Sequence, residues 1–243
     1  MRKKLISHNS SLITKIIIFA KISALKILAR ILSYLFHPLI IPTYMVLLLL
    51  LINPYLFGVN SLHQGFLIIL RIFFTTFLIP CVAVLIMKGI GLISSLEMEQ
   101  RTDRIGPFIA TGIFYLWAFR SLLADTSVPS AYLVCILGAT IVLFVCFIIN
   151  IFYKVSIHAA AIAGFLGMVL ICMHLYSVGI FKVDLPFLGE CIISMNFVLI
   201  TSILIAALVM SSRLILQVHS TTQIFLGFAV GLLGQFVALK ILI

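Results

Sequence analysis

The chain of 243 residues is 64% hydrophobic and only 9% charged, whereas about half of a soluble domain is apolar and about a quarter is charged. These proportions exclude a soluble globular domain and indicate an integral membrane protein whose length suits one helical bundle. Much of the net charge of +10 precedes residue 31 and is not interleaved with aromatic residues, which favours contact with anionic lipid headgroups and not nucleic-acid binding.

Residues 1–38 are predicted to form a basic N-terminal segment at the membrane interface. Within it, residues 11–37 have the period of an amphipathic helix, with Lys15, Lys26 and Arg30 on one face and large apolar residues opposite. Each charge would cost about 2.5–3.5 kcal/mol near the bilayer centre, so an interfacial helix bound to anionic lipid headgroups is favoured over a span. The alternative is an ordinary basic flank that has no lipid-binding role.

Residues 39–243 are expected to form one transmembrane helical domain, because about 20 apolar residues cross the hydrocarbon of a bilayer. Apolar stretches of suitable length occur at 40–57, 66–88, 107–123, 131–153, 157–177, 191–210 and 222–242. The predicted fold class is all-α, a polytopic transmembrane helical bundle of six to seven spans that follows the interfacial helix. Gly227 and Gly231 form a small-xxx-small pair that predicts close helix packing in the last span.

Polar residues gather in three connections between the predicted spans. The first runs from Glu97 to Pro107, the second from Lys154 to His158, and the third from Ser212 to Gln223. Two spans separate the first connection from the second, and two more separate the second from the third. An even number of crossings returns the chain to the same face, so the sequence predicts one composite site built from all three connections.

The side chains in these connections suit phosphoryl transfer. A phosphate needs cations and oriented donors around its oxygens, a nucleophile such as a neutral imidazole, and an acid that protonates the leaving oxygen. The candidate imidazoles are His158 and His219. The candidate phosphate ligands are the cations Arg101, Arg104, Lys154 and Arg213, with Ser156 and Ser212 as hydroxyl donors.

The third connection resembles the third signature of the type 2 phosphatidic acid phosphatase superfamily, the integral-membrane lipid phosphate phosphatases. Ser212 and Arg213 are followed, after five residues, by His219, which is the family's spacing. The family places an aspartate four residues after this histidine, and here Gln223 occupies that position. This third signature is the most specific part of a resemblance that covers residues 97–225.

The other two connections resemble the remaining signatures with departures. In the second, Ser156 and His158 are kept, while Val155 and Ile157 replace the family's proline and glycine. In the first, two residues separate Arg104 from Pro107, where the family has adjacent arginine and proline. Glu97 stands where the family has lysine, and Arg101 is the candidate substitute.

The resemblance implies a role for each of these residues. His219 would attack phosphorus to form a phosphohistidine, and His158 would protonate the leaving group. Gln223 would orient His219 through its amide oxygen without the family's negative charge, so the chain is either an active variant or a binding-only relative. Arg213, Arg104 and Arg101 would hold the phosphate with help from Ser156. The mechanism implies no cofactor and no metal ligand.

Three alternatives use the same residues differently. A lipid phosphotransferase would use the same histidines with an acceptor other than water. A metal-dependent transferase would need Glu97, Glu99 and Asp103, which do not share one helical face and lack the Asp-rich pattern of membrane prenyltransferases. A catalytically inactive lipid-binding or transport protein is the third alternative, but a transport pathway would usually need more ionisable groups within the spans.

The expected substrate is an amphiphilic phosphate: a phosphatidic acid, a polyprenyl diphosphate or a phosphorylated glycolipid. With seven spans, the three connections share the side of the basic N-terminus, so the positive-inside rule predicts a cytoplasmic site in a bacterial inner membrane. If residues 12–36 also span, the site faces outward, as in most characterised members of the family that the chain resembles. The sequence leaves the oligomeric state open.

Overall fold

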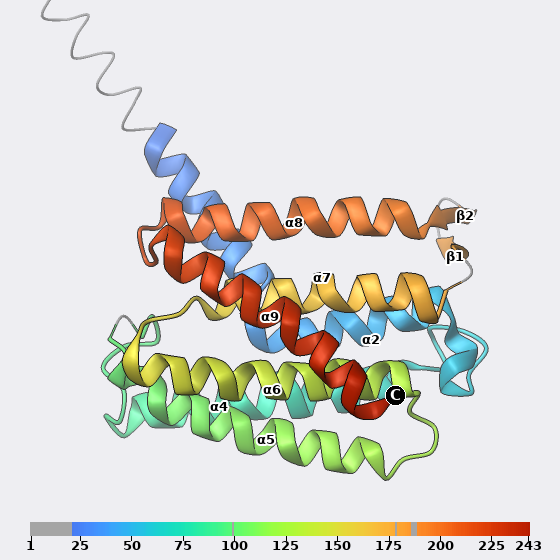
Figure 1. Ribbon diagram of the computed structural model, residues 1–243, viewed down its shortest axis with the longest axis horizontal. Helices are drawn as coiled ribbons and strands as arrows, with labels where there is room; N and C mark the ends of the chain where they lie inside the picture. Colours follow the sequence, from blue (N-terminus) through green and yellow to red (C-terminus); the bar gives the residue numbers. More distant parts are fainter. Residues whose placement is uncertain (1–20, 99, 178, 186–188) are drawn as a thin grey trace, which may run out of the picture.

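The structure of the protein is a computed structural model that describes residues 21–98, 100–177, 179–185 and 189–243. The long helices α5, α6, α7 and α8 lie roughly parallel, and α9 crosses them obliquely (Figure 1). We call the left end of the bundle in Figure 1 the histidine end and the right end the hairpin end. Residues 90–104, 153–156 and 216–220 connect the helices at the histidine end, and residues 53–65, 124–129 and 176–194 do so at the hairpin end.

A helix of residues 21–35 precedes the bundle and runs obliquely away from it beside α8 (Figure 1). His37 has an extended backbone because the following Pro38 disfavours the helical conformation, so the helix ends before it. The 3₁₀ turn η1 (Pro38–Ile40) then leads into α2 (Ile41–Ile52). The first part of the predicted helix of residues 11–37 lies outside the described residues.

The next span is one helix in three parts, in which the π-helical turn η3 (Phe74–Leu78) separates α3 (Phe66–Phe73) from α4 (Ile79–Gly89). Pro80 has no N–H for the carbonyl of Thr76, so the regular helical ladder is interrupted at this turn.

The described residues contain seven helical segments long and apolar enough to cross a membrane, the first of which is Lys21–Ile52. This finding confirms the predicted fold class, and the protein is an all-α polytopic integral membrane protein. The remaining helices are η2 (Pro54–Phe57), η4 (Thr102–Arg104), α5 (Ile105–Leu123), α6 (Ser130–Phe152), α7 (Ile157–Leu175), α8 (Met195–Ile215) and α9 (Thr221–Leu242).

Helix α9 packs closely on α7, as the small-xxx-small pair predicts. A Cβ atom at Gly227 would collide with the carbonyl oxygen of Ser156, and one at Gly231 would collide with that of Ala160. The two glycines therefore allow backbone contact between the helices. As a result, the N-terminal ends of α7 and α9 lie together, and the Ser156 N–H donates to the carbonyl of Gln223 (3.2 Å).

The predicted span 191–210 begins too early. Residues up to Ser194 belong instead to an antiparallel hairpin of β1 (Ile180–Leu185) and β2 (Gly189–Ser194), in which Ile180 pairs with Ser194. Gly189 has a φ of +71°, a conformation that glycine adopts without steric cost. Helix α8 then starts at Met195, with the Ser194 hydroxyl capping the N–H of Phe197 (3.2 Å).

Candidate functional site

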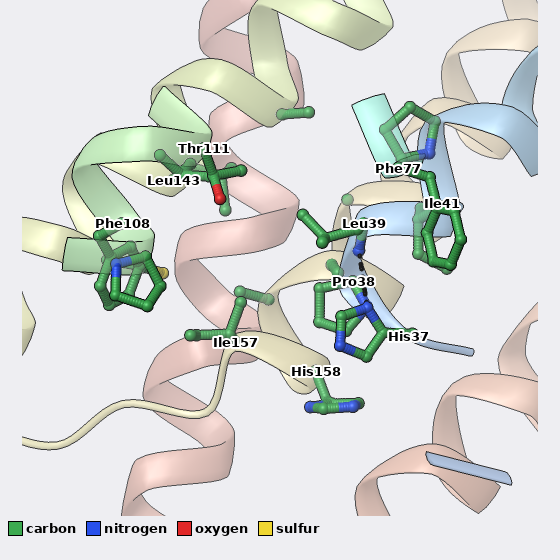
Figure 2. A pocket seen from close by; sticks show the side chains of 18 of the residues that line it. His37, Pro38, Leu39, Ile41, Phe77, Phe108, Thr111, Leu143, Ile157 and His158 are labelled. Atoms are coloured by element: carbon green, nitrogen blue, oxygen red, sulfur yellow. Dashed lines mark hydrogen bonds between the residues drawn. The ribbon is translucent and has the colours of Figure 1, made fainter. Parts of the chain in front are cut away.

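A cavity of about 580 Å³ opens near the histidine end of the bundle. Four of the predicted site residues line it: Arg104, His158, Arg213 and His219. They come from the three connections that are expected on one face, and the structure brings these four side chains to one cavity. In Figure 2, His37 and His158 lie on one side of the cavity, and Phe108, Thr111 and Leu143 lie on the other.

The turn between α8 and α9 presents His219. Helix α8 ends in a Schellman motif, in which Val218 N–H donates to the Arg213 carbonyl and Gln217 N–H to the Leu214 carbonyl. Gln217 takes the left-handed position, with a φ of +57°. Since this motif reverses the chain just after Arg213, it brings the guanidinium-bearing end of α8 and the imidazole of His219 to the same cavity.

Gln223 holds His219 and caps α9 at the same time. Its Oε1 atom lies 3.0 Å from Nδ1 of His219 and also accepts from the Ser220 N–H (3.3 Å). The Ser220 hydroxyl accepts from the Gln223 N–H in return, which completes a capping box. An amide oxygen can only accept, so Nδ1 of His219 carries the proton and Nε2 is left with its lone pair.

The surroundings keep His219 neutral. Burial is the main cause that lowers the pKa of this imidazole from 6.5 to about 3, and the charges of Arg104, Arg213 and Lys154 lower it further. The hydrogen bond to Gln223 acts in the opposite direction and is the second largest effect. Only 8% of the residue is exposed, so His219 is a neutral, partly dehydrated imidazole in a positive field.

His158 occupies the second position of α7 and is oriented by a residue far away in the chain. Ser156 is the N-cap of α7 and accepts from the Ala159 N–H (3.4 Å), which fixes the start of the helix. Nε2 of His158 lies 3.2 Å from the carbonyl oxygen of Ser33. Because a carbonyl only accepts, Nε2 carries a proton and Nδ1 is the nitrogen that is left to exchange one.

Arg213 is held by a serine and keeps one donor without a partner. Its Nη1 donates to the Ser33 hydroxyl (3.0 Å). Its Nε atom is buried and has no acceptor among the described residues. A buried charged donor without an acceptor is costly, and an anion in the cavity is the kind of partner that would satisfy it.

Arg104 is 6% exposed and is anchored by backbone oxygens. Its Nε donates to the Met98 carbonyl (2.9 Å) and its Nη1 to the Val155 carbonyl (3.0 Å). Met98 reaches this position in the left-handed region, with a φ of +46°. The two bonds fix the plane of the guanidinium and leave Nη2 without an acceptor among the described residues.

The other four predicted phosphate ligands do not line the cavity. Arg101 donates to the carbonyls of Ile151 (3.1 Å) and Phe152. Ser156 is fully buried as the cap of α7, and the Ser212 hydroxyl donates to the Val209 carbonyl (2.6 Å). Lys154 acts through its charge on His219. Arg101, Ser156 and Ser212 therefore make contacts that shape the connections around the cavity.

The first connection contains the carboxylates that a metal-dependent transferase would need. Glu97 lines the cavity and makes no salt bridge with Arg101 within the described residues. Within the same residues, no three His, Cys, Asp or Glu side chains gather as a metal site requires.

His37 and Ser33 are site residues that the sequence analysis missed. The His37 ring lines the cavity with its centroid 5.7 Å from that of His158, and its Nδ1 accepts from the Leu39 N–H (3.4 Å; Figure 2). In the sequence, both residues fall on the polar face of the predicted helix of residues 11–37, together with Arg30. That alignment was visible in the sequence, but nothing in it pointed to contact with residues more than 120 positions away.

The interior of the cavity is apolar. Its walls include the apolar residues Met45, Phe108, Leu143 and Phe165, and Phe77 packs against His37. The polar Gln235, on α9, lies fourteen residues beyond the start of that helix, which is about 21 Å at 1.5 Å per residue. The cavity therefore joins a cationic mouth to an apolar chamber that extends along the helices.

No family model, curated protein sequence or solved structure matches this chain.

Proposed function

We propose that the protein is a membrane phosphatase that hydrolyses a lipid phosphate or a polyprenyl diphosphate through a phosphohistidine intermediate. The observation that carries the proposal is the meeting of four residues, His219, His158, Arg213 and Arg104, at one apolar cavity. A phosphate monoester has a compact anionic group that suits the arginines. Its hydrocarbon chain suits the chamber behind them.

In the first step, Nε2 of His219 attacks phosphorus while Arg213 and Arg104 hold the phosphate oxygens. The N–P bond forms, and the bond from phosphorus to the lipid oxygen breaks with its electron pair on that oxygen. The lipid oxygen takes a proton from Nδ1 of His158, which enters this step as imidazolium. Burial and the charge of Arg213 oppose that charged form before substrate binds, so His158 takes its proton once the negative charge of the bound phosphate offsets Arg213, and the Ser33 carbonyl then accepts from Nε2.

In the second step, water replaces the histidine on phosphorus. The oxygen of water forms a bond to phosphorus as the N–P bond breaks, and Nδ1 of His158 takes the proton from that water. Inorganic phosphate leaves, and His219 returns to its neutral state. Throughout, the Gln223 oxygen holds the Nδ1 proton of His219, so Nε2 stays directed to the reaction.

Helix ends add to the attraction for an anion at this mouth. Helices α7 and α9 both begin at the histidine end, each with a serine cap, Ser156 and Ser220. The N-terminus of a helix carries a partial positive charge. The resulting field adds to that of the arginines.

We propose further that the protein lies in a bacterial inner membrane. The basic residues of the N-terminal helix would bind anionic lipid headgroups, and the excess of lysine and arginine on that side would put the site in the cytoplasm. Lys21, Lys26 and Arg30 are exposed and so are available for that contact.

Phosphate release by the purified protein in detergent with EDTA, from a panel of lipid phosphates, tests the proposal. We expect release by the wild type and by His174→Ala, because His174 lies near the other end of α7 and bonds only to the Leu170 carbonyl (2.9 Å). We expect none from His219→Ala, and acid-labile phosphate on the wild type after a rapid quench. A folded wild type that releases no phosphate from any lipid would refute the phosphatase. Transfer that requires an added lipid alcohol would assign the transferase instead.

A further inference from the structure

Ser33 is the point at which the N-terminal helix meets the bundle. In the helix of residues 21–35, only Ala29 and Ser33 are buried, and they lie one turn apart on the face towards the bundle. Apart from the half-buried Leu32, the large apolar side chains of this helix are exposed, among them Leu28 and Ile31. The helix is therefore attached to the bundle through a narrow contact that centres on Ser33.

Both polar groups of Ser33 are used by residues of the cavity. Its carbonyl oxygen lies 3.2 Å from Nε2 of His158, and its hydroxyl oxygen accepts from Nη1 of Arg213 at 3.0 Å. The two partners lie 125 and 180 residues away in the chain. One residue thus holds the proposed acid and one of the two proposed phosphate ligands.

Arg213 is a donor, so the Ser33 hydroxyl must act as the acceptor in this contact. The other hydrogen bonds of the hydroxyl leave it free to do so. Its single proton goes to the Ala29 carbonyl at 2.8 Å, which leaves its lone pairs for the guanidinium. The neighbouring Ser212 hydroxyl lies 3.3 Å away but donates its own proton to the Val209 carbonyl. Because each serine hydroxyl donates its proton to a backbone carbonyl, the two hydroxyls make only a packing contact with each other. Arg213 is therefore the donor to the Ser33 oxygen.

We propose that Ser33 is a positioning residue of the phosphate site, and that the N-terminal helix is thereby part of that site. The Arg213 side chain is long and flexible, and its Nη1 has this one acceptor among the described residues. Without the Ser33 hydroxyl, the guanidinium loses the contact that fixes its plane, so phosphate is bound by a less ordered ligand. The Ser33 carbonyl is backbone and stays in place when the side chain is changed.

This separation gives Ser33 a signature that a purely structural residue would not have. Removal of the hydroxyl acts on Arg213 and leaves the bond to His158, so KM for a lipid phosphate should rise about tenfold while kcat changes little. The pH dependence of kcat, which reports the histidines, should not move. A structural residue would instead change both parameters, together with the melting temperature.

Four variants make the test. Ser33→Ala removes the hydroxyl, Ser33→Cys removes the strong acceptor at nearly constant volume, and Ser33→Thr restores it. Ser23→Ala is the matched control, because Ser23 lies on the same helix and makes no hydrogen bond with another described residue. We expect KM to rise in Ser33→Ala and Ser33→Cys and to return towards the wild-type value in Ser33→Thr. KM should not change in Ser23→Ala. In an Arg213→Lys background, the effect of Ser33→Ala should disappear, because both changes remove the same contact.

Because this inference rests on the proposed phosphatase, one readout is kept independent of turnover. Binding of inorganic phosphate to the purified protein, followed by phosphorus NMR, should weaken about tenfold in Ser33→Cys and not in Ser23→Ala. If that holds while no lipid phosphate is hydrolysed, the phosphatase fails and Ser33 stands as a ligand-positioning residue. Equal phosphate binding by the wild type, Ser33→Ala and Ser33→Cys, or additive effects of Ser33→Ala and Arg213→Lys, would overturn the inference.

Discussion

The basic side chains at the two ends of the bundle have different kinds of partner. At the hairpin end, Arg71 donates to Asp125 (2.5 Å) and to the Ser121 hydroxyl (2.9 Å), and Lys182 pairs with Glu190 (2.9 Å). At the histidine end, Arg104 and Arg213 donate to carbonyl and hydroxyl oxygens, which carry no charge. Among the described residues, neither of these two arginines has a carboxylate within 4 Å.

This contrast separates structural charges from charges kept for a ligand. A paired arginine is electrically satisfied within the protein, whereas a buried arginine bonded only to neutral oxygens retains its charge. Burying such an unpaired charge in a membrane protein costs free energy unless an anion binds to it. The unpaired charges at the histidine end are therefore the arrangement that the proposed function requires.

The largest effect is expected when an unpaired arginine at the histidine end is replaced, compared with a paired arginine at the hairpin end. Arg213→Met should lower kcat/KM for a lipid phosphate by about 100- to 1000-fold, because a charged donor to the phosphate is removed from a buried site. Arg71→Met breaks a pair that is 39% and 31% exposed, so it should change stability by less than about 1 kcal/mol and leave kcat/KM near wild type. Steady-state kinetics measure kcat/KM, and thermal melts measure stability. Equal losses of activity in both variants would abolish the distinction between the ends.

The next prediction concerns the support of His219. Gln223→Met keeps the length of the side chain but removes the acceptor, and it should lower kcat about a hundredfold because the imidazole is no longer held in one tautomer. Gln223→Glu keeps the capping box and adds the negative charge, so it should raise the pKa of His219 and the rate at neutral pH. Rapid-quench measurements of phosphoenzyme formation report the step directly.

Ser220→Ala separates the two tasks of Gln223. It removes the serine cap of α9 and leaves the bond between Gln223 and His219. We expect a loss of about 1 kcal/mol of stability and a small change in kcat. If Ser220→Ala slows phosphoenzyme formation as much as Gln223→Met, then capping of α9 and not orientation of His219 is the function of Gln223.

A smaller effect is expected from acid. The pKa of His219 is about 3 in the fold and near 6.5 in an unfolded chain, so between these values the unfolded state binds the additional proton. Stability should therefore fall as the pH drops below 6.5, by at most about 1.4 kcal/mol per pH unit from this group. The melting temperature of His219→Gln should depend less on pH over this window than that of the wild type. Identical pH profiles would show that His219 is not buried as a neutral base.

The contrast between the ends also shows what the sequence could predict. Apolar length located the spans, and the even number of crossings brought His158 and His219 to one cavity, because both depend only on chain order. The hairpin before Met195 was missed since its apolar residues continue the pattern of α8. Ser33, His37 and the Met98 carbonyl were missed because their contacts depend on how distant helices cross and on one left-handed residue. No local pattern encodes such contacts.

The smallest effect is expected where the N-terminal helix meets the lipid. Lys21, Lys26 and Arg30 are exposed, and each basic residue near an anionic membrane surface contributes about 1 kcal/mol of attraction. Replacing all three by glutamine should remove about 3 kcal/mol of that attraction, so we expect activity to fall in vesicles that contain phosphatidylserine and to change little in purely zwitterionic vesicles. Lys182→Gln, at the hairpin end, is the control and should not change the ratio between the two vesicle types. A lipid dependence that survives the triple replacement would place the response to anionic lipid at Arg104 and Arg213, where headgroups would then compete with substrate, and raising the phosphatidylserine content would increase KM.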